Sequence, residues 1–583
     1  ATDITDTKQT LEYETERPNS LYDPSGSFQS INRRYDIVYG DVMLNFNYNI
    51  RRFDIAATLG WTGRYENMNN MRVSTNGGLV TENWFDLNAS RYTASSTLQR
   101  MELLKTGYMG TLSLGWDNYL FLELTGRQER SSTLKDKSFF YPSANLSFLF
   151  SNAFRMPAWW NHGKLRLSYG IVGNAPETYA ANIIYEQGSD NGFTWNYVPS
   201  SWGNANIRPE KKYEYEIGLE SKFLNNRLGF DVSYYNNRVK DQILSTPQPS
   251  SSGVKYVLMN VGEVANEGWD ISVSATPVLT KNFRWDLTAN YGIYRNKVVK
   301  LAEGVPYLEI SNIGGGGAKI QAVEGRPMGD IYVQMPQMNE NGDYLVSDKG
   351  LYLNQTDLQR VGNINPDGVG GLFSSFSYKN IFLDFSIDFR IGGDVINEMY
   401  QYSTASGLTP ESLQYRDTEH GGLSYYYPGN NNASGTPVQV DPSSGAGPNG
   451  EIIYHDGIIL PGVVASTGEK NTRIIPAGYY YNQTYNWGTQ SEQLTYRHSV
   501  FDNTYVKLRE LTIGYQFPEK LTAKLGMTRL SVSIFGRNLF YFYKALKNYD
   551  AESSVGTSWA SQAVVGGSTT ATRNFGVSLR ASF

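Results

Sequence analysis

The chain has 583 residues, no cysteine and a formal net charge of −5 at pH 7. The lack of cysteine excludes a disulfide framework, a thiol nucleophile and a thiolate metal site, and the slightly acidic balance gives no electrostatic case for binding nucleic acid. No apolar run approaches the roughly 18 residues that a transmembrane helix needs. A membrane β-barrel is not excluded, because its strands alternate and their hydrophobicity disappears in any average.

Period-two alternation begins at Val42 and recurs along the chain as pairs of strands around a polar turn. Segments 42–50 and 53–64 flank Arg51-Arg52, and similar turns fall at Asp117-Asn118 and Lys379-Asn380. Alternation of this length between such turns is a strong strand signal. We predict about fifteen strands, at 42–50, 53–64, 112–116, 120–124, 140–150, 164–173, 213–219, 228–234, 269–275, 283–291, 372–376, 381–389, 504–516, 529–538 and 575–583.

The connections fall into two classes. Tight turns join the members of each hairpin, whereas long polar segments rich in Gly, Asn and Tyr lie between hairpins, at 66–106, 174–210, 240–264, 297–367, 392–503 and 539–572. Long extracellular loops and short periplasmic turns are typical of outer-membrane barrels. One face of each strand is apolar and the other is polar, as in Lys212, Glu214 and Glu216, which suits lipid outside and water inside. The sequence therefore predicts an all-β, transmembrane antiparallel β-barrel.

We interpret residues 1–583 as a single β-barrel portion, with an extracellular loop at 1–34 and strands and loops at 35–583. The chain ends on an alternating strand, FGVSLRASF, whose last residue is aromatic. We interpret this strand as the one that closes the barrel. A bacterial barrel needs an even number of strands. Counting back from a periplasmic end, we expect the chain to begin inside an extracellular loop, with an odd number of strands upstream. A soluble sandwich, β-helix or propeller is disfavoured, because no fixed repeat period appears.

Nine stretches in series resemble the SusC-like TonB-dependent transporters of the Bacteroidota outer membrane. No single stretch is specific, but their order and spacing match the family's barrel from about residue 100 to the end; Gln128-Glu129-Arg130 stands where the family more often has Asp-Gly. The stretches are LTGRQERSS (124–132), YPSANLSF (141–148), KLRLSYGIVGN (164–174), NANIRPEKKYEYEIGLESKFLNNRLGFDVSYYNNRVKDQIL (204–244), NVGEVANEGWDISVSA (260–275), EGRPMGDIY (324–332), NINPDGVGGLFSSFSYKNIFLDFSIDF (363–389), YVKLRELTIGYQFP (505–518) and LSVSIFGRNLF (530–540).

The resemblance implies a 22-stranded barrel in the bacterial outer membrane, with an N-terminal plug domain and a TonB-contacting motif that this sequence does not contain. It implies active import of glycans or oligopeptides, of which we favour glycans, and no enzymatic activity. The implied partners are a SusD-like surface lipoprotein, the TonB–ExbB–ExbD system acting through the plug region, the N-terminal barrel segment and the lipid bilayer. A dimer of transporter–lipoprotein pairs is compatible with the family. Two alternatives are a passive outer-membrane pore and a soluble all-β carbohydrate-binding protein.

Catalytic and metal-binding patterns are weak. The pair His498-Ser499 and the carboxylate rows on the polar faces are better explained as loop polar groups and solvated pore wall. We expect no cofactor. A Ca²⁺ site at Asp441, Asn449 and Glu451 is an alternative, although the spacing matches no known calcium loop.

Aromatic residues in the long connections are the candidate ligand-binding residues. Flat aromatic faces flanked by Asn, Asp and Gln suit sugar rings, and peptides nearly as well, whereas the alternative is that the rings pack the loops together or against a lid protein. The predicted residues are Trp195, Tyr197, Trp202, Tyr425, Tyr426, Tyr427, Tyr480 and Trp487.

Overall fold

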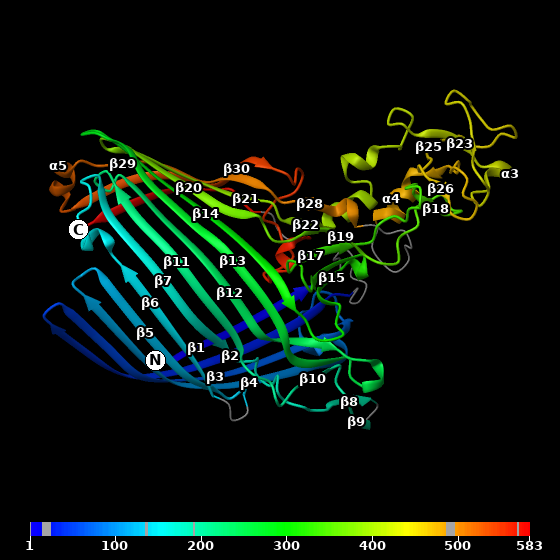
Figure 1. Ribbon diagram of the computed structural model, residues 1–583. Coiled ribbons are helices and arrows are strands. Elements are labelled where there is room, and N and C mark those ends of the chain that lie inside the picture. Colours follow the sequence, from blue (N-terminus) through cyan, green and yellow to red (C-terminus); the bar gives the residue numbers. More distant parts are fainter. Residues whose placement is uncertain (1, 14–24, 135–137, 191–192, 486–495, 568–570) are drawn as a thin grey trace. The chain divides into compact units, whose positions relative to one another are not determined.

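The computed structural model describes residues 2–13, 25–134, 138–190, 193–485, 496–567 and 571–583 (Figure 1). The chain forms two compact units. The first comprises Ala1–Glu220 and Tyr235–Ala265, and the second comprises Ser221–Tyr234 and Asn266–Phe583. No helix in the described ranges is long and apolar enough to cross a membrane.

The first unit is built mainly from strands β1 to β7, in which each strand pairs antiparallel with the next. A separate hairpin, β8–β9, and the short strand β10 follow. The strands are β1 (Thr2–Tyr13), β2 (Ser27–Ile50), β3 (Phe53–Leu79), β4 (Ser90–Trp116), β5 (Leu120–Ser131), β6 (Ser138–Phe148), β7 (Trp160–Asn174), β8 (Glu186–Asp190), β9 (Phe193–Tyr197) and β10 (Ser201–Trp202), with the short helix α1 (Phe150–Ala153) between β6 and β7.

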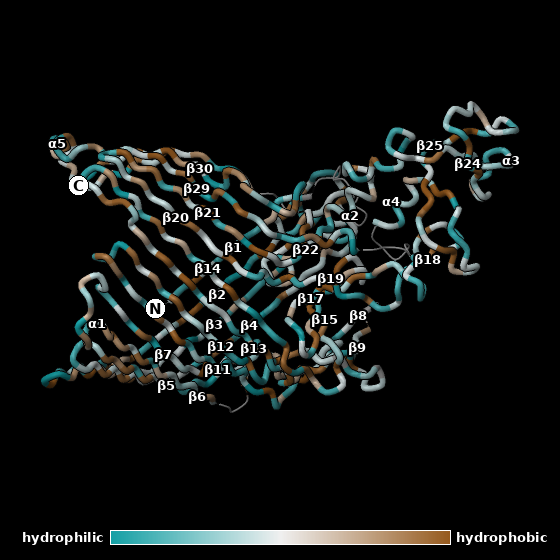
Figure 2. The backbone as a smooth tube through the Cα atoms, turned by 45° about the horizontal axis from the view of Figure 1, so that its top comes forward, coloured by the Kyte–Doolittle hydropathy of each residue, from teal (hydrophilic) through white to brown (hydrophobic). Residues whose placement is uncertain are grey.

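The register explains the alternating sequence. Leu44 of β2 pairs with Leu59 of β3, and the two side chains share a face on which Leu59 is 63% exposed. On the opposite face the Thr58 hydroxyl donates a hydrogen bond to Asn45 at 2.8 Å. Figure 2 shows this alternation of apolar and polar residues along the strands. An exposed apolar face opposite a hydrogen-bonded polar face is the pattern expected of a wall between lipid and water.

The predicted hairpin turns are confirmed. Arg51, Asp117 and Lys379 all have positive φ angles of 52° to 54°, as the tight connections between twisted antiparallel strands require. Each of the fifteen predicted strands overlaps a strand of the structure.

Parts of three predicted loops belong to strands of the large antiparallel sheet instead. Residues 1–34 hold β1, which pairs with β2 from Thr2–Val38 to Tyr13–Ser27. Most of 66–106 belongs to β3 and β4, and most of 240–264 belongs to β12 (Leu228–Pro247) and β13 (Tyr256–Leu279). In these extensions polar and apolar residues do not alternate strictly, as the start of β13, YVLMNVGEV, shows, so they carry no clear hydrophobic period. Their strand structure comes from backbone pairing with a neighbouring strand.

Strands β12 and β13, together with β11 (Glu210–Phe223), contribute residues to both units. Within the second unit, β14, β20, β21, β29, β30 and β32 pair antiparallel in that order. Their bounds are β14 (Phe283–Lys300), β20 (Gly368–Tyr378), β21 (Ile381–Ile391), β29 (Tyr505–Gln516), β30 (Arg529–Lys544) and β32 (Asn574–Ser582).

The long connections of the second unit are folded into small sheets and helices. The sheets contain β15 (Tyr307–Ile313), β16 (Ala318–Val323), β17 (Asp330–Val333) and β19 (Gln359–Asn363); β18 (Leu345–Val346) and β26 (Val463–Val464); β22 (Asp394–Asn397), β28 (Val500–Asp502) and β31 (Val564–Val565); and β23 (Leu423–Tyr426), β24 (Val438–Gln439), β25 (Tyr454–Ile458) and β27 (Ile475–Pro476). The helices are α2 (Glu398–Ala405), α3 (Pro428–Asn431), α4 (Ala477–Tyr485) and α5 (Glu519–Thr522).

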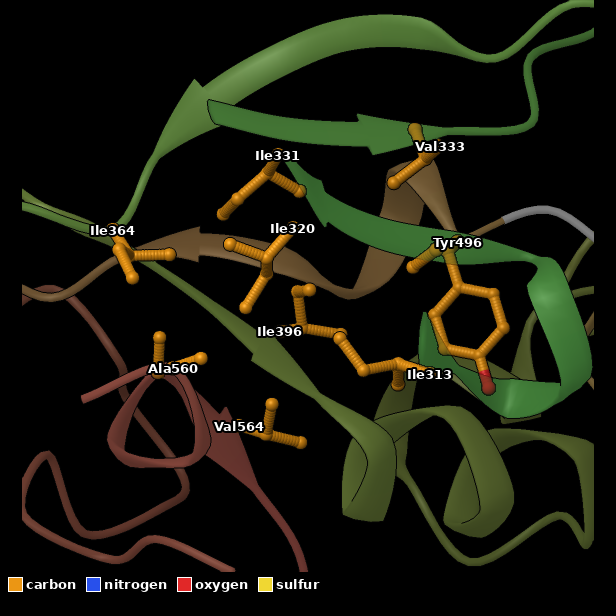
Figure 3. Packing of buried hydrophobic residues seen from close by; sticks show 11 residues of the cluster. Ile313, Ile320, Ile331, Val333, Ile364, Ile396, Tyr496, Ala560 and Val564 are labelled. Carbon is orange, nitrogen blue, oxygen red and sulfur yellow. The ribbon is translucent and has the colours of Figure 1, made fainter. Parts of the chain in front are cut away.

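A buried apolar cluster joins three of these connections (Figure 3). Ile320 and Ile331 come from β16 and β17, Ile396 comes from β22, and Val564 comes from β31; all four side chains are 3% exposed or less. Burial of such side chains contributes roughly 1.5–3 kcal/mol each. The connections at 297–367, 392–503 and 539–572 therefore share one core.

Candidate ligand-binding surfaces

The hairpin β8–β9 presents a row of aromatic side chains on one of its faces. Residues paired across an antiparallel hairpin point to the same side. Glu186 pairs with Tyr197 and Gly188 with Trp195, and Phe193 lies two residues before Trp195 on the same face. Phe193, Trp195 and Tyr197 are all exposed. The hairpin thus carries three aromatic rings on one face and polar residues on the other.

Two contacts hold these rings in place. The Trp195 indole covers Gly188 closely, since a Cβ atom at Gly188 would lie 2.8 Å from the indole Cε2 atom. The Tyr197 hydroxyl donates a hydrogen bond to the Glu186 carboxylate, and this bond raises the pKa of Tyr197. The predicted residues Trp195 and Tyr197 therefore lie together on a pre-ordered surface. Pre-ordering reduces the entropy that binding would cost.

Trp202 lies apart from this row. It belongs to β10, which pairs parallel with the start of β13, and its ring meets Tyr185 edge-on at 5.9 Å between centroids. The ring is partly buried. Trp202 stays a predicted ligand-binding residue, but its contact with Tyr185 is a packing contact.

The predicted tyrosines of β23 and the segment after it differ in exposure. Tyr425 is 1% exposed, its ring stacks on Tyr454 at 5.5 Å, and its hydroxyl donates to Asp456 at 3.1 Å. A buried ring offers no surface to a ligand, so the geometry of Tyr425 supports packing. Tyr426 and Tyr427 are partly buried beside it, and both stay predictions.

Tyr480 lies in helix α4 and contacts Tyr481 edge-on, with 5.1 Å between ring centroids. It lines a cavity in the second unit together with other tyrosines. Burial raises the pKa of Tyr480 well above its usual value, so its hydroxyl is neutral at ordinary pH. Trp487, the last predicted residue, lies outside the described residues.

The two carboxylates of the suggested Ca²⁺ loop, Asp441 and Glu451, each accept hydrogen bonds from residues of their own turn. Asp441 accepts hydrogen bonds from the amide and hydroxyl of Ser443 at 2.9 and 2.5 Å, and Glu451 accepts one from the Asn449 amide at 2.9 Å. These bonds hold the pKa of both carboxyl groups below the usual range. Among the residues that the structure describes, no three His, Cys, Asp or Glu side chains form a metal-binding group. The Ca²⁺ site stays a prediction.

The groups considered for catalysis have structural partners. The Ser499 hydroxyl donates to Gln401, and the His498 ring stacks on Tyr485. On the polar strand faces, Glu214 accepts from Lys212 and Asn237 at 2.6 and 3.1 Å. These contacts fit a solvated wall and a packed loop.

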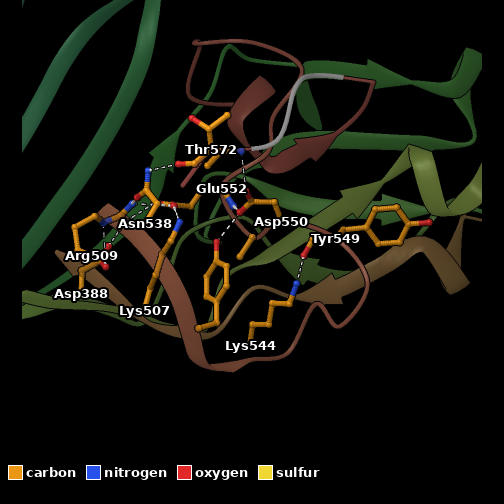
Figure 4. Close-up of polar contacts among 12 residues, drawn as sticks. Asp388, Lys507, Arg509, Asn538, Lys544, Tyr549, Asp550, Glu552 and Thr572 are labelled. Carbon is orange, nitrogen blue, oxygen red and sulfur yellow. Dashed lines mark hydrogen bonds and ion pairs between the residues drawn. The ribbon is translucent and has the colours of Figure 1, made fainter. Parts of the chain in front are cut away.

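An ion-pair network that the sequence did not reveal ties the connection at 545–573 to the strands of the second unit (Figure 4). Glu552 pairs with both Lys507 and Arg509 of β29, and Arg509 also pairs with Asp388 of β21. Burial alone would raise the pKa of Glu552, but the hydrogen bonds from Arg509 and Lys507 outweigh it and lower that pKa. Lys507 and Arg509 share the sequence parity of the apolar Leu511 and Ile513, and a register shift falls between Leu508 and Glu510, so the period of two did not predict this network.

The fold and these surfaces define an outer-membrane β-barrel, and comparison with known proteins gives its family. The chain belongs to the TonB dependent receptor-like β-barrel family, whose model matches residues 2–323. This confirms the predicted localisation in the bacterial outer membrane and the resemblance to SusC-like transporters. In such a barrel the apolar strand faces meet lipid and the polar faces meet the lumen.

Several curated proteins are similar to the chain. TonB-dependent receptor P3 of Formosa agariphila is 23% identical over 483 residues, which cover 77% of this chain and 42% of that protein. TonB-dependent receptor P26 of the same organism is 30% identical over 330 residues, or 50% of this chain and 32% of that protein. TonB-dependent receptor SusC of Bacteroides thetaiotaomicron is 27% identical over 247 residues, or 38% of this chain and 24% of that protein. The chain spans less than half the length of each.

Among solved structures, the RagAB peptide transporter has the same fold. It superimposes with a TM-score of 0.72 and 18% sequence identity, over 100% of this chain and 59% of that chain.

Proposed function

We propose that the chain takes part in active import across the outer membrane of nutrients too large for passive diffusion, with oligosaccharides favoured over oligopeptides. Membership of the TonB dependent receptor-like family supports energised transport. The similarity to SusC supports the assignment to a nutrient importer. The observation that carries the ligand class is the exposed row of Phe193, Trp195 and Tyr197 on the β8–β9 hairpin.

The chemistry of this row favours sugars. A sugar ring presents C–H groups that stack on an aromatic face and hydroxyl groups that bind carboxylates or amides at its edge. Trp195 supplies the face, and the Glu186 carboxylate next to Tyr197 supplies an acceptor. Binding sites of this kind combine apolar surface with a few placed polar groups.

The proposed partners are a SusD-like surface lipoprotein that covers the ligand and the TonB–ExbB–ExbD system, which would act through a plug region. A dimer of transporter–lipoprotein pairs is the proposed assembly. Co-purification tests the lipoprotein: native mass spectrometry of the detergent-extracted complex should detect a lipoprotein of SusD size together with this chain. Extraction without such a partner would contradict this part of the proposal.

Uptake by cells that carry the intact protein tests the ligand surface. Trp195→Ala should reduce uptake of a labelled oligosaccharide, because stacked aromatic contacts contribute roughly 0.5–1.5 kcal/mol each. Asn196→Ala is the matched control, because Asn196 lies on the opposite face of the same hairpin. Equal uptake by both variants would argue against ligand binding by the β8–β9 hairpin. Uptake of labelled oligopeptides but not oligosaccharides would favour the other ligand class.

A further inference from the structure

The second unit contains a cavity of about 550 Å³ whose wall is rich in tyrosine. The cavity lies between helices α2 and α4 and strand β25, and its size is within the range of small-molecule sites, roughly 300–1,000 Å³. The tyrosines that line it are Tyr352, Tyr400, Tyr415, Tyr480, Tyr481 and Tyr485. On one side the cavity borders a compact apolar cluster that includes Leu351, Ile458 and Leu460.

The rings support one another. Tyr480 and Tyr481 meet edge-on at 5.1 Å, and Tyr400 meets Tyr485 edge-on at 6.2 Å. The Tyr481 hydroxyl donates to the backbone carbonyl oxygen of Glu411 at 2.8 Å, which fixes that ring against the segment after α2. These contacts keep several aromatic faces in place around the cavity, so a ligand would meet a pre-ordered site.

Four of the tyrosine hydroxyl groups that line the cavity have a strongly raised pKa and are neutral at ordinary pH. Burial raises the pKa of both Tyr352 and Tyr481 to about 12, and it raises the pKa of Tyr480 and Tyr485 further. Neutral phenols both donate and accept hydrogen bonds. The wall therefore offers aromatic faces together with neutral hydrogen-bonding groups.

The charge of the wall disfavours anionic ligands. Among the described lining residues, Glu411 is the one charged side chain, and none is a cation. The Arg416 guanidinium lies 5.4 Å from the centre of the Tyr481 ring but is not a lining residue. A phosphate, a uronate or a peptide carboxylate would therefore meet the Glu411 carboxylate with no counter-charge in the lining itself, and an unpaired buried charge is costly. A neutral ring with hydroxyl groups meets no such cost.

We propose that this cavity is a second binding site, separate from the β8–β9 hairpin, for a neutral sugar unit of an oligosaccharide. The ring would stack on the tyrosine faces, and its hydroxyls would bind the phenols and the Glu411 carboxylate. The choice of ligand class rests on the proposed function. The site itself rests on the tyrosine wall and its charge.

The test uses the purified intact protein in detergent on a printed array of neutral oligosaccharides, uronate-containing oligosaccharides and short peptides. Because the hairpin can also bind sugars, the array is read in a Trp195→Ala background. Neutral oligosaccharides should bind, and Tyr480→Ala should weaken that binding at least tenfold. Tyr479→Ala is the matched control, because Tyr479 is the preceding residue of α4, is 37% exposed and does not line the cavity.

Two readouts separate the outcomes. Tyr480→Phe keeps the ring and should lose less affinity than Tyr480→Ala, and near-ultraviolet circular dichroism should show that both variants are folded. Retained neutral-sugar binding in folded Tyr480→Ala would overturn the cavity site. Binding of only peptides or uronates would also overturn it. Neither result bears on the import proposal, which is tested separately by measuring uptake in cells that carry the hairpin variants.

Discussion

The ammonium group of Lys507 lies 4.7 Å from the centre of the Tyr541 ring, and the same ammonium pairs with Glu552 although Lys507 is only 2% exposed. Tyr541 in turn donates a hydrogen bond to Asp550 at 2.5 Å. A strand of the barrel wall and a connection 45 residues away are therefore held together by charged contacts.

Removal of this contact should loosen the connection. Lys507→Met leaves Glu552 with Arg509 alone, and a hydrogen bond to a charged group contributes about 1.5–3 kcal/mol. Amide hydrogen exchange of residues 545–567 should therefore be roughly 10- to 100-fold faster than in the unmodified protein. Lys547→Met, at an exposed position of the same connection, is the control and should exchange at the original rate. An unchanged exchange rate in Lys507→Met would show that the Lys507–Glu552 ion pair does not hold the connection in place.

Acid should weaken the packing around α4. Burial lowers the pKa of His498, and the neighbouring Arg497 lowers it further. The ring is therefore neutral in the folded protein and takes up a proton more readily when unfolded, where its pKa is about 6.5. Its contribution to the free energy of unfolding is complete above about pH 6.5 and is lost as the pH falls toward the folded-state pKa.

Thermal unfolding at pH 7.5 and pH 5.5 measures this loss, with His498→Gln as the comparison. Burial raises the pKa of Glu398 in α2, which has the opposite sign, but that group is present in both proteins and cancels in the difference. The unmodified protein should lose more stability on acidification than His498→Gln. An equal loss would show that His498 does not titrate as its burial implies.

The position of Trp195 depends on the glycine beneath it. In Gly188→Ala the new Cβ atom would lie 2.8 Å from the indole, so the ring must move off its present place. We expect oligosaccharide affinity to fall about 2- to 10-fold, the range that one aromatic contact contributes. Gly445→Ala, where no atom lies within 4 Å of the new Cβ, is the control. An affinity equal to that of the control would mean that the indole position is irrelevant to binding.

The two faces of β3 should respond differently to charge. Leu59 is on the apolar face and Thr58 is on the polar face beside Asn45. An arginine on the lipid face near the bilayer centre costs roughly 2–4 kcal/mol, whereas one in the lumen is solvated. Leu59→Arg should lower the amount of folded, heat-modifiable protein in the outer membrane, and Thr58→Arg should not. The reverse order would contradict the assignment of the faces.

Tyr425 should affect stability and not binding. Tyr425→Phe removes the hydrogen bond to Asp456, which costs about 1 kcal/mol, and leaves the ring in place. The denaturation midpoint should fall slightly while oligosaccharide affinity stays the same. Tyr426→Phe on the adjacent, partly buried ring provides the comparison. A loss of affinity in Tyr425→Phe would support the prediction that Tyr425 binds ligand.

The strands with one apolar face could be predicted from sequence because lipid on one side and water on the other impose a period of two on every residue. Where a strand extends beyond the bilayer, both of its faces meet water and the period of two is lost. Strand β1 contains mainly Thr, Asp, Lys and Gln, so nothing in its pattern separates it from a loop, and its pairing with β2 appears only in the structure.

The candidate binding residues were harder to predict because an aromatic ring is equally suited to a surface and to a core. Trp195 and Tyr425 both lie in long connections rich in polar residues. Gly188 and Glu186 leave Trp195 and Tyr197 exposed, whereas Tyr454 and Asp456 enclose Tyr425. The partners decide the role, and they lie far away along the chain or across a hairpin. The Lys507–Glu552 contact was missed for the same reason.

Energy coupling is the most direct test of the account. Uptake of a labelled neutral oligosaccharide should be measured in cells that carry the intact protein, before and after a protonophore collapses the proton motive force. Active TonB-dependent import predicts that accumulation stops when the proton motive force is lost. Uptake that continues at the same rate would identify a passive pore and contradict the proposed mechanism.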